Sequence, residues 1–192
     1  MPVLLDGETK DIAQIRAVAC SREEVVIPPE AAERIEMSRR VVEEIIARGR
    51  RVYGITTGFG KFADVSISRH ELEVLQENLV RSHATGVGEP FAQDEVRAAM
   101  FLRANALAKG MSGIRLEVIR MLVELLNRGV TPVVPRKGSV GASGDLAPLA
   151  HISLVLLGGG EAWCDFGAKG PFRGEEAFRA AGLEPITLEA KE

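Results

Sequence analysis

The residues best suited to chemistry in this sequence stand in the stretch Gly138–Leu149, which reads G-S-V-G-A-S-G-D-L-A-P-L. Glycine tolerates positive φ angles and close backbone approach, so this stretch can fold tightly back on itself. In such a turn the amide nitrogen of Gly144 can approach the carbonyl carbon of Ala142 and close a ring. Loss of water from that ring and from the Ser143 side chain would leave a methylene conjugated to a carbonyl, an electrophile that no ordinary side chain offers.

Local composition alone also fits less reactive structures. A glycine-rich turn before a helix is more often a plain loop or an anion-binding nest. Two other motifs do not fit. The hydrolase elbow G-x-S-x-G fails because Asp145 stands at the second glycine position. The phosphate loop fails because Ile55 stands where the first glycine should precede Gly60-Lys61.

The elements that must position this stretch are mostly helices. Apolar periodicity and capping residues predict helices over 9–19, 29–49, 94–109, 114–128 and 175–181, with another that begins at a capping box at Ser68 and ends near His83. Ser112 is expected to cap the helix over 114–128 and Gly129 to end it. Extended segments are expected at 25–27, 51–55 and 132–135, and a small hairpin at 161–170. The sequence therefore predicts a mainly α fold with a few short strands.

The helix expected over 146–157 directly follows the small-residue stretch. Asp145 is placed to cap it, and Pro148 is tolerated in its first turn, where N–H groups have no intrahelical acceptor. The helix is apolar nearly all round, so we expect it to be buried with its positive end toward Ser143. His151 is expected to be a buried structural histidine on this helix.

The run from Gly138 to Ser153 resembles the signature of the aromatic amino acid ammonia-lyases, whose Ala-Ser-Gly tripeptide forms a methylidene-imidazolone (MIO) electrophile. The resemblance extends through 52–60 (V-Y-G-I-T-T-G-F-G) and 82–88 (S-H-A-T-G-V-G) and covers essentially all 192 residues. It implies that residues 1–192 form a single N-terminal domain of the family's fumarase/aspartase-like helical fold. The MIO loop would be 138–145, and the family's C-terminal helical part would be absent.

The resemblance also assigns roles to individual residues. Ala142, Ser143 and Gly144 would form MIO, and Tyr53 would be the catalytic base. His83 would line the substrate pocket, and Gly60 would let its loop close over the site. Without the resemblance, Tyr53 fits a half-buried strand aromatic, and His83 fits a core histidine bonded to a backbone carbonyl.

Ser82-His83 resembles the histidine-specific members of the family. This implies elimination of ammonia from L-histidine to trans-urocanate by a homotetramer with shared active sites and no diffusible cofactor. A tyrosine or phenylalanine ammonia-lyase, or an aminomutase, is the alternative within the same chemistry. A catalytically inactive truncated fragment is the alternative from another class, and we expect little turnover from residues 1–192 alone.

Composition excludes several other classes. A net charge of −3 without a basic stripe argues against nucleic-acid binding. The most apolar stretch, 146–157, is too short to span a membrane, and Met1–Asp6 does not resemble a signal peptide, so a cytoplasmic location is expected. Cys20 and Cys164 form no ligand cluster with the three histidines, which argues against a metal site, and a disulfide between them stays open.

Overall fold

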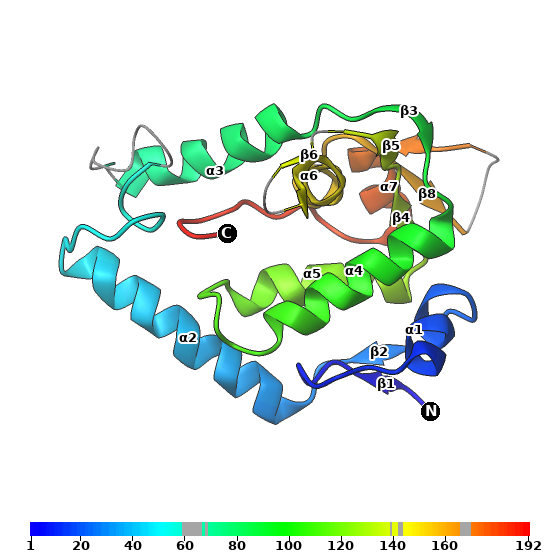
Figure 1. The fold of residues 1–192 in the computed structure, drawn as a ribbon, viewed down its shortest axis with the longest axis horizontal. Coiled ribbons are helices and arrows are strands. Elements are labelled where there is room, and N and C mark those ends of the chain that lie inside the picture. Colours follow the sequence, from blue (N-terminus) through cyan, green and yellow to red (C-terminus); the bar gives the residue numbers. More distant parts are fainter. Residues whose placement is uncertain (59–66, 68, 139, 142–143, 166–169) are drawn as a thin grey trace.

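The computed structural model describes residues 1–58, 67, 69–138, 140–141, 144–165 and 170–192. Within these ranges the chain forms seven helices and nine short strands (Figure 1). The helices are α1 (Ile12–Ala19), α2 (Pro29–Ala47), α3 (Arg69–His83), α4 (Gln93–Leu107), α5 (Leu116–Asn127), α6 (Leu146–Leu156) and α7 (Gly174–Ala181). The predicted mainly α fold with a few short strands is confirmed.

The strands pair in small separate sheets among the described residues. β1 (Val3–Leu4) lies parallel to β2 (Val25–Val26), while β3 (Val87–Pro90) and β5 (Pro135–Lys137) are antiparallel. β8 (Glu161–Cys164) pairs with both β4 (Val130–Pro132) and β9 (Phe172–Arg173), and β6 (Val140–Gly141) pairs with β7 (Gly144–Asp145). β8 and β9 form the predicted hairpin, but its second strand lies at 172–173, beyond the predicted end at 170.

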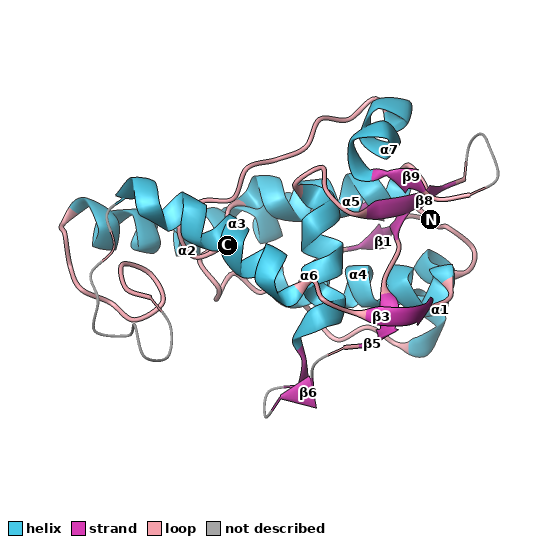
Figure 2. Cartoon of the chain, turned by 90° about the horizontal axis from the view of Figure 1, so that it is seen from above, coloured by secondary structure: helices cyan, strands magenta, loops and turns pink. Residues whose placement is uncertain are grey.

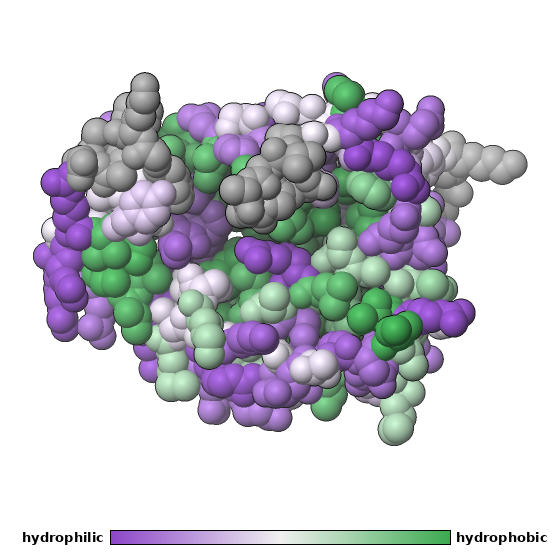
Figure 3. Space-filling model, viewed as in Figure 1, coloured by the Kyte–Doolittle hydropathy of each residue, from purple (hydrophilic) through white to green (hydrophobic). Residues whose placement is uncertain are grey.

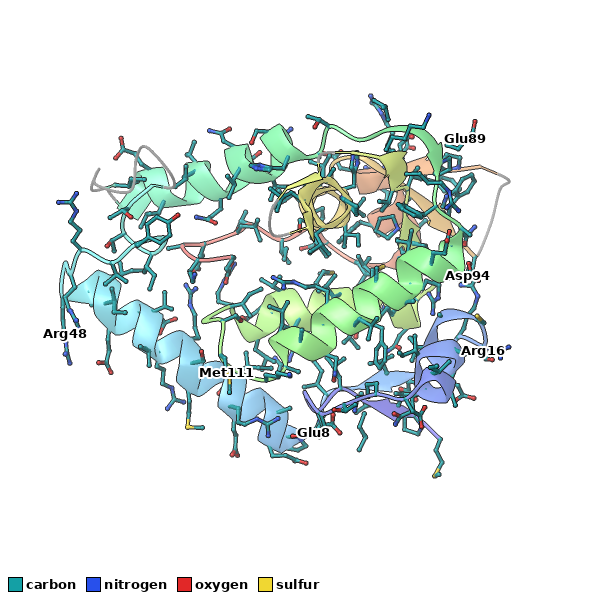
Figure 4. All side chains as sticks on the ribbon, in the orientation of Figure 1. Glu8, Arg16, Arg48, Glu89, Asp94 and Met111 are labelled. Carbon is teal, nitrogen blue, oxygen red and sulfur yellow. The ribbon has the colours of Figure 1, made fainter. Side chains whose placement is uncertain are left out.

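The core is built around α4 and α5, which pack side by side in the middle of the molecule (Figure 1). Side chains crowd around both helices in Figure 4. Met100 and Phe101 of α4 and Ile119 of α5 are fully buried in the core. α1 covers one side of α4, and α6 and β4 lie against α5 on the other. Burial of this apolar surface is the main source of stability, at about 25 cal/mol for each Å² removed from water.

One arginine is buried inside this core. Arg97 on α4 is 1% exposed and donates hydrogen bonds to the carbonyls of Val18 and Ala19 at the end of α1 and of Leu126 near the end of α5. Burial lowers the pKa of Arg97 to about 10, so its guanidinium stays charged at neutral pH. The side chain therefore satisfies C-terminal carbonyls of two helices, which have no intrahelical donor.

Three sequence predictions need correction. Residues 51–55 do not form a strand, because the chain turns at 53–56 with hydroxyls of the same segment holding the turn. Ser112 does not cap α5, whose N-cap is Arg115, and the Ser112 hydroxyl is buried without a partner among the described residues. α6 is not buried all round, because the neighbouring elements leave one side open and Leu146 and Leu149 are 44% and 37% exposed.

Residues 183–192 run back between α3 and the α4–α5 pair (Figure 1). The half-exposed Glu189 pairs with Arg39 of α2, and Glu192 pairs with Arg115 at 2.6 Å. Arg39 also donates to the Ala190 carbonyl at 2.9 Å. These contacts join the last residues of the chain to α2 and to the start of α5.

The surface mixes residue types. On the face in Figure 3, hydrophobic patches are visible among hydrophilic side chains. None of the helices in the described part of the chain is both long and apolar enough to cross a membrane.

Candidate active site

The small-residue stretch enters and leaves its turn as a narrow β-hairpin, which projects from the helical body in Figure 2. Val140 pairs with Asp145, and Gly141 pairs with Gly144. The chain thus folds back on itself, as predicted. Ala142 and Ser143, the other two residues of the expected MIO tripeptide, lie outside the described residues.

The approach to the hairpin rests directly on α6. A Cβ atom added to Gly138 would lie 2.6 Å from the Cβ of Ala147, which is fully buried in the first turn of the helix. Real Cβ atoms do not approach this closely, so only glycine fits at position 138 without displacement. The chain leaves β7 straight into α6, which places the hairpin at the positive end of the helix dipole. The residues flanking the tripeptide thus fit a tightly closed turn.

Tyr53 lies in a turn held by two threonine hydroxyls. Thr56 Oγ1 accepts from the Val52 amide at 2.9 Å and donates to the Arg50 carbonyl at 2.7 Å, and Thr57 Oγ1 accepts from the Gly54 amide at 3.3 Å. Both threonines are less than a tenth exposed, whereas Tyr53 is 62% exposed. The backbone on both sides of Tyr53 is therefore fixed while its side chain is largely open to solvent.

Sequence reasoning missed the part played by these threonines. Hydroxyls of Ser and Thr commonly bond to nearby backbone groups and close turns. The adjacent threonines between Gly54 and Gly58 are the sequence signal that could have predicted this turn. Gly54 has a φ of +67°, a conformation that favours glycine and that also argues against the predicted strand.

His83 is the last residue of α3 and is partly buried. Its Nδ1 lies 2.7 Å from the Leu79 carbonyl and 3.1 Å from Ser82 Oγ. Since a carbonyl only accepts, Nδ1 donates the hydrogen in this contact, which leaves Nε2 for another partner. The hydrogen bond to a backbone carbonyl matches the structural alternative considered for His83, and the same bond also orients the ring.

A hollow of about 230 Å³ connects the Tyr53 turn with α3. It is bordered by Gly54 next to Tyr53, by Leu79 one turn before His83, and by Gln76, Arg103, Leu107, Ser112, Ile114, Lys191 and Glu192. Its volume is below the roughly 300 to 1,000 Å³ of most ligand pockets. The structure thus brings the turn of Tyr53 and the helix of His83 to one hollow, and α3 also packs against α6, which follows the hairpin.

The remaining predictions for the site concern Gly60 and metals. Gly60 lies outside the described residues. Within the described ranges, no group of three or more His, Cys, Asp or Glu side chains is arranged to hold a metal ion. Cys20 and Cys164 are free thiols, and burial raises the pKa of Cys164.

Comparison with known proteins agrees with this geometry. The overall fold is shared with a histidine ammonia-lyase and a tyrosine aminomutase of known structure. Histidine ammonia-lyase from Trypanosoma cruzi matches with a TM-score of 0.91 at 40% identity, over 100% of this chain and 36% of that one. Tyrosine aminomutase from Streptomyces globisporus matches with a TM-score of 0.90 at 39% identity, over 100% and 35%.

The family model for aromatic amino acid lyases matches residues 11–192. The chain therefore belongs to the aromatic amino acid lyase family. Over 190 residues it is 53% identical to histidine ammonia-lyase from Caldanaerobacter subterraneus subsp. tengcongensis. The alignment covers 99% of this chain and 37% of that relative, so the chain spans little more than a third of its relative's length.

Proposed function

We propose that the chain is the N-terminal part of a histidine ammonia-lyase, which converts L-histidine to trans-urocanate and ammonia. The observation that carries this proposal is the 53% identity, over nearly the whole chain, to a protein with that name. The Tyr53 turn, the end of α3 and the glycine hairpin are the three structural features through which these residues would act.

The reaction needs a base for a weakly acidic β-proton and a way to remove a poor leaving group. The C–N bond breaks and a C=C bond forms, so the reaction needs no oxidant. In our proposal Tyr53 takes the β-proton, and its fixed turn sets the position of the phenol. His83, with its Nδ1 bonded to Leu79, presents Nε2 to orient the substrate.

For the leaving amine we propose MIO formed from Ala142, Ser143 and Gly144, a built-in electrophile that makes a diffusible cofactor unnecessary. The Gly141–Gly144 pair and the contact of Gly138 with Ala147 support this proposal, because they hold the flanking backbone in a tight turn. The dipole of α6 would stabilise negative charge at the turn by on the order of 1 kcal/mol. Gly60 is proposed to let its loop close over the site.

An aminomutase is the second candidate, because the solved tyrosine aminomutase is about as similar in fold and sequence as the solved histidine ammonia-lyase. An aminomutase would return the amine to the β-carbon. Tyrosine and phenylalanine ammonia-lyases would carry out the same elimination with a different pocket for the side chain of the substrate.

We further propose that residues 1–192 act as one N-terminal domain within a cytoplasmic homotetramer. The exposed Leu146 and Leu149 at the start of α6 support contact with a further part of the protein or with another subunit, since exposed apolar side chains gain stability when covered. In this proposal residues 1–192 alone have little turnover, and strong histidase activity from them would contradict it.

The function is tested by incubating a chain of full family length that contains these residues with L-histidine, L-tyrosine and L-phenylalanine separately. We expect urocanate and ammonia from histidine and little product from the other two. β-Amino acid products would identify an aminomutase, and activity on tyrosine alone would exclude the histidine assignment. A Tyr53→Phe variant is the matched control and should lose the elimination.

A further inference from the structure

His151 on α6 makes a contact that the proposed mechanism does not use. Its Nε2 accepts a hydrogen bond from the Gly86 amide at 3.0 Å, across 65 positions of sequence. The ring is only partly buried, whereas the sequence predicted a buried structural histidine. The bond nevertheless gives the ring a defined partner in the segment that follows His83.

The contact requires one form of the ring. An amide N–H only donates, so Nε2 must be unprotonated, and the neutral ring carries its hydrogen on Nδ1. Burial lowers the pKa of His151, which favours this neutral form.

The absence of a side chain at Gly86 leaves room for this contact. The φ of Gly86 lies outside the left-handed region, so the backbone conformation does not demand glycine. A Cβ at this position would instead lie 3.0 Å from His151 Nε2 and 3.2 Å from the Pro135 Cβ. The two residues are therefore fitted to each other, both by the hydrogen bond and by the space between them.

The contact joins two parts of the candidate site. Gly86 is three residues after His83, and the Thr85 amide bonds back to the His83 carbonyl at 2.8 Å. His151 lies one and a half turns into the helix that follows the glycine hairpin. A shift of Gly86 away from α6 would therefore move the end of α3, which carries His83, relative to the hairpin.

We infer that His151 is a positioning residue that fixes the end of α3, and so His83, against the helix that follows the electrophilic turn. This inference rests on the proposed function, because it assigns the purpose of the contact to the lyase site. His151 touches neither substrate nor reacting atoms in this role. Its effect is on where the imidazole of His83 meets the substrate.

The test compares His151→Gln, whose side-chain oxygen can accept the Gly86 amide, with His151→Leu, which cannot. Gly86→Ala disturbs the same contact by adding a Cβ at Gly86. It provides a second test if His151→Leu fails to fold. Ser153→Ala, also on α6, is the control for substitution in this helix. Hydrogen exchange of the amide at position 86 is measured on each chain, and ¹⁵N signals of the His151 ring on the chains that keep this histidine. KM and kcat for L-histidine are measured on chains of full family length.

We expect the Nδ1–H tautomer, and faster Gly86 exchange in His151→Leu and Gly86→Ala but not in His151→Gln. The KM for histidine should rise about tenfold in the first two variants and stay near wild type in the glutamine variant. A loss of folded enzyme alone would lower kcat without changing KM. An unchanged KM in His151→Leu despite faster exchange would overturn the inference, as would an Nε2–H tautomer. A wild-type enzyme inactive on histidine would instead contradict the proposed function. The exchange and tautomer data would still test the hydrogen bond between Gly86 and His151.

Discussion

The Tyr53 turn and the glycine hairpin present their residues in opposite ways. In the Tyr53 turn, side-chain hydroxyls of Thr56 and Thr57 satisfy the backbone, and the turn would lose its hold if those hydroxyls were removed. In the hairpin, backbone lies against α6 with no room for another atom at Gly138. The Tyr53 turn therefore depends on two side-chain hydroxyls, whereas the hairpin depends on the absence of a side chain at Gly138.

This difference makes the hairpin the more sensitive region to an added methyl group. Gly138→Ala would place a Cβ 2.6 Å from the Ala147 Cβ. Overpacking of this kind costs about 1 to 3 kcal/mol, and here it would also push the hairpin away from α6. We expect a lower free energy of unfolding in urea and reduced dehydration of the turn, measured by peptide mass.

The double variant Gly138→Ala/Ala147→Gly is the control, because it removes the opposing methyl group. It should recover dehydration of the turn even though glycine in a helix costs up to about 1 kcal/mol. If the single variant behaved like wild type, the close contact between Gly138 and Ala147 would be wrong.

The Tyr53 turn should be sensitive to the loss of a hydroxyl instead. Thr56→Val keeps the shape of the side chain but leaves the Val52 amide and the Arg50 carbonyl without their partner. An unsatisfied buried polar group costs about 1 to 3 kcal/mol, and we expect a loss near the lower end because Arg50 is exposed. Thr56→Ser keeps the hydroxyl and should stay close to wild type in urea unfolding. Equal stability of the valine and serine variants would show that the hydroxyl does not hold the turn.

Acidification should weaken the packing of α6, which follows the hairpin and carries His151, and should not weaken the Tyr53 turn. Burial lowers the pKa of His151 below its ordinary value of 6.5, so the unfolded chain binds the proton more readily than the folded chain. The contribution of His151 to stability is therefore complete above pH 6.5 and is lost as the pH falls through the lower folded pKa. The unfolding free energy of wild type should therefore fall relative to that of His151→Gln over this range, and a difference independent of pH would contradict the burial of the ring.

The smallest effect is expected on the surface of α3. Glu77 and Arg81 form an exposed pair four residues apart at 2.7 Å. Such pairs contribute about 0.3 to 0.5 kcal/mol, so Glu77→Gln should reduce the unfolding free energy by no more than this. A loss above about 1 kcal/mol would mean that the end of α3 is held by this pair more than by its contact with α6.

Much of the fold could be predicted from local patterns. The stripes of apolar residues on α4 and α5 and the glycine after α5 gave their positions to within a few residues, because each signal lies within the element it describes. The strand predicted at 51–55 failed because the bonds from Thr56 to Val52 and Arg50 outweigh β propensity. The Ser112 cap failed because the helix starts later, at Leu116.

The site was harder to predict than the fold. Resemblance to the family was needed to single out Tyr53, which is exposed in a turn, and His83, whose bond to Leu79 is equally typical of a structural histidine. The contact between His151 and Gly86 had no sequence signal, because the two residues are 65 positions apart and meet only when α3 packs on α6.

The most direct test of the proposed chemistry is the mass of the tryptic peptide Gly138–Lys169 from a chain of full family length. Trypsin cuts after Lys137 and Lys169, and no lysine or arginine lies between them, so this peptide carries the whole Ala142-Ser143-Gly144 tripeptide. We predict a mass lower by two water molecules, with the loss located in that tripeptide. An unmodified peptide from a folded, full-length chain would contradict the proposed electrophile and, with it, the lyase mechanism.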